Sequence, residues 1–111
     1  MNPKELRIGN WVLNDGNLFQ IEHGYEIGDA IHQYEPTPLT EEWLLKFGFE
    51  NGNLEMSNND LWDKHWIGDF EIEKYENRFT LSLTPFYTDI YFVHHLQNLY
   101  FALTGNELCV V

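Results

Sequence analysis

Val93–Gly105 reads VHHLQNLYFALTG and is expected to form the helix around which the rest of the chain is organised. At about 100° per residue its apolar side chains fall in one stripe, the spacing of a helix that packs on a core. The stripe consists of Val93, Leu96, Leu99, Tyr100 and Leu103. Gly105 ends the helix, because glycine adopts the left-handed conformation without steric cost. The pattern predicts a helix over residues 93–103.

The opposite face of this helix is the first candidate interaction face. It consists of His94, Gln97, Asn98 and Phe101. Phe101 is a large aromatic residue on an otherwise polar surface. Either a second layer of the protein covers it, or it contacts a partner.

A second, shorter helix is predicted over residues 41–47. Thr40 is a good N-cap, because its hydroxyl oxygen can accept hydrogen bonds from amides of the first turn. Gly48 is suited to the left-handed position after the last turn. A helix of about two turns is not stable alone, so its apolar side chains must pack on a sheet. These side chains are Trp43, Leu44 and Phe47.

Two antiparallel hairpins are predicted. In the first, Asp15-Gly16 favours a type I′ turn, which sets Val12 opposite Phe19. In the second, residues 70–84, a two-residue loop sets Tyr75 opposite Arg78. Residues 25–32, 87–92 and 108–111 are further candidate strands, whereas the conformation of residues 51–68 is left open.

Together these patterns predict an α+β fold. We expect residues 1–111 to form a single domain of antiparallel hairpins, with a curled or barrel-like sheet and two helices packed on it. The N-terminus lacks the apolar run of a signal peptide, and no stretch approaches about 20 apolar residues. The only cysteine, Cys109, cannot form an internal disulfide and is expected to be buried. A cytoplasmic protein is the expectation.

The charge limits the class of partner. Eighteen acidic against six basic residues give a net charge of −12, and the bases are scattered along the chain. Binding of a phosphate backbone needs clustered Lys and Arg, so neither direct nucleic-acid binding nor attachment to an anionic membrane is expected. The expected partner is another protein or a second copy of this chain.

Two further surfaces are candidates for binding. Asp69, Glu71 and Glu73 alternate along a predicted strand, so their carboxylates project the same way. They could serve acid–base chemistry, a hard cation or a DNA-like charge surface, or they could form an ordinary solvated face. Trp62 and Trp66 share a face in either a helix or a strand and are candidate exposed aromatics for stacking on a sugar or peptide.

Apart from the acidic row, no pattern in the sequence points to catalysis. Adjacent residues on a helix diverge by about 100°, so His94 and His95 are not expected to share a metal ion. No serine, cysteine or lysine stands in the context of a nucleophile. The sequence therefore predicts no catalytic residue, no metal, no cofactor and no enzyme activity.

Three segments carry a family resemblance. They are Leu6–Val12, Pro38–Phe49 and Val93–Gly105. Together they resemble a family of small uncharacterised proteins from gut Bacteroidetes and their prophages or mobile elements, with residues 51–77 as the variable part. The resemblance implies an intracellular, phage-linked context and transfers no catalytic residue.

Three functions are consistent with these observations. The first is a small accessory or regulatory protein that acts through protein–protein contact. The second is an acidic, DNA-like decoy that occupies a nucleic-acid-binding protein. The third and weakest is a small enzyme or ligand-binding module that uses acidic and tryptophan side chains. A pocket holding two acids with raised pKa would favour the third.

Overall fold

The computed structural model describes residues 5–29, 34–55, 61–75, 78–83 and 86–111. The chain divides into two compact units. The first unit contains residues 1–38 and 92–108, and the second contains residues 39–91 and 109–111. Helices and two antiparallel sheets confirm the α+β prediction, with the strands divided between a three-stranded and a five-stranded sheet. In the described residues, no helix has the length and apolar character needed to cross a membrane.

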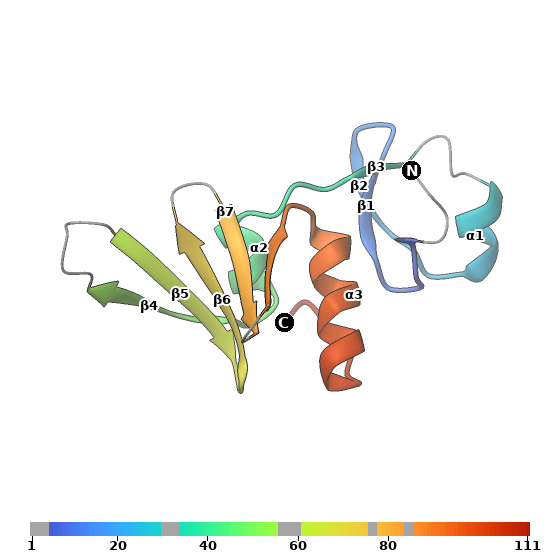
Figure 1. Ribbon diagram of the computed structural model, residues 1–111. Coiled ribbons are helices and arrows are strands. Elements are labelled where there is room, and N and C mark those ends of the chain that lie inside the picture. The colour runs from blue at the N-terminus through green and yellow to red at the C-terminus, as the bar shows by residue number, and fades with distance from the viewer. Residues whose placement is uncertain (1–4, 30–33, 56–60, 76–77, 84–85) are drawn as a thin grey trace. The chain divides into compact units, whose positions relative to one another are not determined.

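The first unit holds the three-stranded sheet, in the order β2-β1-β3 (Figure 1). Its elements are β1 (Trp11–Asn14), β2 (Asn17–Gln20), α1 (Gly24–Asp29), β3 (Tyr34–Pro36) and α3 (Val93–Thr104). The predicted first hairpin is confirmed, with Val12 opposite Phe19. Asp15 and Gly16 have φ angles of 51° and 80°, the two positive values that a type I′ turn requires.

A small apolar core fills the first unit. Leu6, Val12, Ile21 and Tyr34 are buried in it, and Phe19 and Ile27 pack against them. The prediction of a strand over residues 25–32 is wrong for residues 25–29, which belong to helix α1. The helical turn places Ile27 on the core, and the Tyr34 hydroxyl donates a hydrogen bond to the carbonyl oxygen of Glu26. Residues 30–33 lie outside the described part of the chain.

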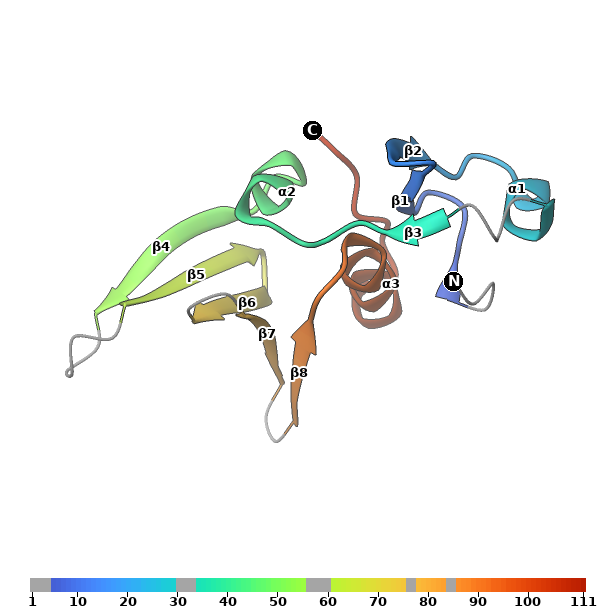
Figure 2. The same cartoon turned by 90° about the horizontal axis from the view of Figure 1, so that it is seen from above.

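The second unit is built on the five-stranded sheet, in which the strands follow one another in chain order (Figures 1 and 2). Its elements are α2 (Glu41–Lys46), β4 (Glu50–Glu55), β5 (Leu61–Ile67), β6 (Phe70–Tyr75), β7 (Arg78–Leu83) and β8 (Phe86–Ile90). The second hairpin has the predicted register, with Tyr75 opposite Arg78. Cys109, which was expected to be buried, is exposed, and the predicted strand over residues 108–111 does not form. Instead, the Val111 amide donates a hydrogen bond to the carbonyl oxygen of Lys46, with an N···O distance of 2.8 Å.

Helix α2 is capped at both ends as its sequence predicts. The Trp43 amide donates to Thr40 Oγ1 over 3.4 Å. After the last turn Gly48 has a φ of +87°, and the Phe49 amide reaches back to the Leu44 carbonyl oxygen over 3.0 Å. The caps align a two-turn helix whose apolar side chains are buried. These are Trp43, Leu44 and Phe47.

The five-stranded sheet has one buried and one open face. Strand register assigns residues to the two faces, because directly paired residues project the same way. On the buried face lie His65, Phe70, Ile72, Phe79, Leu81 and Ile90. On the other face, called the open sheet face below, lie Glu50, Lys64, Trp66, Glu71, Glu73, Arg78, Thr80, Tyr87 and Asp89.

Candidate functional site

The predicted interaction face of helix α3 is largely internal to the first unit. His94 and Gln97 are each only 1% exposed, and Asn98 is partly buried. Gln97 Nε2 donates to the Gly9 carbonyl oxygen over 2.7 Å, and the Trp11 amide donates to Gln97 Oε1 over 2.9 Å. The expectation that these polar side chains face a partner is therefore corrected: the residues before and within β1 cover them.

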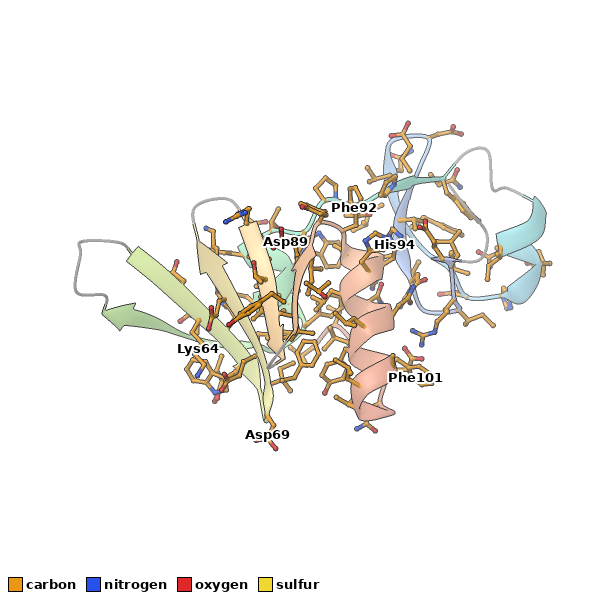
Figure 3. All side chains as sticks on the ribbon, viewed as in Figure 1. Lys64, Asp69, Asp89, Phe92, His94 and Phe101 are labelled. Carbon is orange, nitrogen blue, oxygen red and sulfur yellow. The ribbon has the colours of Figure 1, made fainter. Side chains whose placement is uncertain are left out.

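Phe101 is the member of this face that stays exposed, at 41% (Figure 3). Arg7 lies over its ring, with the guanidinium carbon 4.2 Å from the ring centroid, a cation–π contact. Arg7 also donates to Asn98 Oδ1 over 2.9 Å and forms an ion pair with Glu107. One side of the ring is thus occupied by Arg7 of the same unit.

The apolar stripe of α3 is buried only in its first part. Val93 and Leu96 are fully buried, as predicted. Leu99 and Tyr100 are partly buried, and Leu103 is 48% exposed. The prediction of a core position is therefore wrong for Leu103, which lies in the last turn.

The open sheet face carries two of the three candidate acids and the candidate tryptophan Trp66. Glu71 and Glu73 lie on it, whereas Asp69 lies in the turn that precedes β6 (Figure 3). The strand register adds two residues that were not singled out from the sequence, Tyr87 and Asp89. Tyr87 is 72% exposed. Their place could have been found from the sequence by extending the hairpin register to the next strand.

Trp66 is half-buried rather than exposed. A Cβ atom added at Gly52 in β4 would lie 3.3 Å from the Trp66 ring. The lack of a side chain at Gly52 therefore leaves space for that ring. The Lys64 ammonium lies 6.0 Å from the ring centroid and pairs with Glu71 over 2.9 Å. The side chain of Trp62 lies outside the described part of the structure.

A second arrangement in the first unit brings together groups that bind metals. His94 and His95 have ring centroids 4.3 Å apart, and Glu5 Oε1 lies 4.0 Å from His95 Nε2. The expectation that the two imidazoles diverge is wrong. Phe92 stacks on His94 at 6.0 Å (Figure 3). The pKa of His94 is lowered to about 4, chiefly by burial and also by the nearby His95, whereas Glu5 opposes the shift.

The second unit contains a cavity of about 520 Å³ beside an ion pair. It is lined by Leu39, Thr40, Glu41, Glu42, Lys74 and Phe79. Lys74 Nζ lies 2.6 Å from Glu41 Oε1, and this hydrogen bond holds the pKa of the Glu41 carboxyl below its usual range. A general acid at neutral pH needs the opposite shift. Glu41 therefore lacks the raised pKa that would favour an enzyme.

His65 is buried on the same side of the sheet, and neither of its ring nitrogens has a hydrogen-bond partner among the described residues. Burial lowers the pKa of His65 below 6.5; Glu41 and Asp63 oppose this shift, and Lys74 adds to it. Between the lowered pKa and 6.5, the unfolded chain binds more protons at this position than the folded protein. Stability must therefore fall as the pH drops through this window.

We expect the free energy of unfolding to decrease as the pH is lowered from about 8 to about 5, and His65→Leu to reduce that decrease. Urea unfolding at a series of pH values measures the slope. His23→Leu, which removes an exposed histidine, is the matched control and should keep the wild-type slope. An unchanged slope in His65→Leu would show that His65 is not responsible.

Searches of protein-family models, curated proteins and solved structures each found no match to this chain. The resemblance to the small Bacteroidetes proteins therefore stays a prediction.

Proposed function

We propose that this protein is a non-enzymatic accessory or regulatory protein of the cytoplasm that binds a basic segment of another protein on its open sheet face. The observation that carries the proposal is that Tyr87 is exposed among acidic residues of the open sheet face. This ring is 72% exposed and shares a sheet face with the carboxylates of Glu71, Glu73 and Asp89. Large aromatic side chains are typical anchors of protein interfaces, and the surrounding acids favour a cationic partner.

The charges on the open sheet face and the net charge of the whole chain both favour a basic partner. Four acids lie on the open sheet face against two bases, and one of those bases, Lys64, is already paired with Glu71. The net charge of −12 adds a long-range attraction for basic proteins, which speeds encounter at low salt. A DNA-binding protein with its basic surface is one member of this partner class, so the decoy function remains a special case.

The lowered pKa of Glu41 argues against acid catalysis by this residue in the cavity beside α2. With its carboxylate held in the ion pair with Lys74, the cavity beside α2 has no proton donor at this position near neutral pH. On the open sheet face the Thr80 hydroxyl donates a hydrogen bond to Asp89 Oδ1 over 2.8 Å. The hydrogen bond from Thr80 fixes the Asp89 carboxylate on the face that we propose for the basic partner.

The test is titration of the full chain with a fluorescent arginine-rich peptide, compared with a neutral peptide of the same length. Tyr87→Ser leaves the net charge unchanged and should weaken binding by at least about fivefold, the scale for loss of an interface aromatic. Tyr25→Ser is the matched control, because Tyr25 is 67% exposed but lies in the first unit.

Three results would contradict the proposal. Equal binding of the two peptides would remove the preference for a basic partner. Equal affinities of Tyr87→Ser and the wild type would remove the open sheet face as the site. Sedimentation that shows a dimer dissociated by Tyr87→Ser would assign this face to self-association instead.

A further inference from the structure

We propose that Glu5, His94 and His95 form a three-ligand site for a divalent transition metal of the zinc class. The site lies wholly in the first unit, at the first turn of α3, and is independent of the open sheet face. Each residue offers one ligand atom, and the three atoms lie within 4.8 Å of one another. Two imidazoles and one carboxylate are a ligand set found in catalytic zinc sites, where the fourth position stays open.

The burial of His94 is the second observation that points to a ligand. This residue is 1% exposed, and neither of its ring nitrogens has a hydrogen-bond partner among the described residues. A buried polar group without a partner costs about 1–3 kcal/mol, so such groups in folded proteins call for an explanation. A metal ion bound to an imidazole nitrogen of His94 would supply the missing partner.

The surroundings hold the three ligands close to the geometry that they need. Stacking of Phe92 on His94 restricts the rotation of that ring. Asn98 Nδ2 donates to the Glu5 carbonyl oxygen over 2.6 Å, which fixes the Glu5 backbone beside the helix. Ligands in a tetrahedral zinc site, with bonds of about 2.0–2.2 Å, lie roughly 3.3 Å apart, so a contraction of at most about 1.5 Å completes the site. Glu5 and His95 are partly exposed and free to make it, with side chains 47% and 40% exposed.

The chemistry of the ligands selects the class of metal. Imidazole nitrogens suit zinc, copper, iron and nickel, whereas magnesium and calcium prefer sites made of oxygen ligands. The positive end of the helix dipole opposes a cation at the first turn. The carboxylate of Glu5 and the net charge of −12 counter this repulsion.

The test is calorimetric titration of the full chain with ZnCl₂, and with MgCl₂ for comparison, after dialysis against a chelator. We expect one zinc ion per chain and no heat from magnesium. Glu5→Gln and His95→Ala should each weaken zinc binding by at least about tenfold, the lower range seen even for loss of outer-shell partners. His94 is left unchanged, because its substitution would also disturb the core.

His23→Ala is the matched control, since His23 is an exposed histidine of the same unit outside the three ligands. It should bind zinc as the wild type does. Co²⁺ provides a second readout, because four-coordinate Co²⁺ absorbs visible light much more strongly than the hydrated ion, and His95→Ala should lose that absorption. The proposal is overturned if the wild type binds no zinc, or if His23→Ala weakens binding as much as the two ligand variants do.

Discussion

Leu44→Ala is expected to lower the free energy of unfolding by about 2–5 kcal/mol, the range for truncating a fully buried leucine. Leu44 is 0% exposed on α2, the helix that buries its apolar side on the second unit. Truncation removes transfer free energy and leaves a cavity that close-packed neighbours fill only in part. Urea unfolding followed by tryptophan fluorescence measures the loss.

The adjacent residue provides a matched control. Leu45 is 53% exposed on the same helix, so Leu45→Ala makes the same chemical change with the same effect on helix propensity. Its effect is expected to stay within about 0.5 kcal/mol. Equal losses in the two variants would show that α2 does not bury Leu44 as described.

Features that are encoded by residues close together in the chain could be predicted from the sequence. The cap at Thr40, the left-handed Gly48 and the turn at Asp15-Gly16 are encoded by residues that are neighbours in the chain. Each therefore followed from local rules, and so did the registers of the two hairpins. Leu44 could be assigned to the core because helical spacing groups it with Trp43 and Phe47.

The candidate sites depended on contacts distant in sequence and were predicted less well. The polar side chains of α3 resemble a solvated or binding face until Gly9 and Trp11 are known to lie against them. The metal-ligand cluster is incomplete without Glu5, which comes from the other end of the chain. Periodicity reports which residues share a face and carries no information about what covers that face.

Gln97 is the clearest example, and its replacement tests the revised role of the α3 face. Its side chain is 1% exposed and joins two backbone groups, accepting from the Trp11 amide and donating to the Gly9 carbonyl oxygen. Gln97→Leu keeps a similar volume but loses both hydrogen bonds. The expected cost is about 1–3 kcal/mol in total, because the Gly9 carbonyl oxygen keeps a second donor. Urea unfolding measures the loss.

The Gly9 carbonyl oxygen provides the control for this prediction. It also accepts a hydrogen bond from Gln20 Nε2 over 3.1 Å, and Gln20 is partly exposed. Gln20→Leu thus removes one hydrogen bond to the same acceptor where water can replace the donor, and should cost under about 1 kcal/mol. If Gln97→Leu lowers the free energy of unfolding more than Gln20→Leu does, the Gln97 amide is buried inside the first unit. If Gln97→Leu instead leaves stability unchanged, this face of α3 is open to solvent and becomes available again as a binding surface.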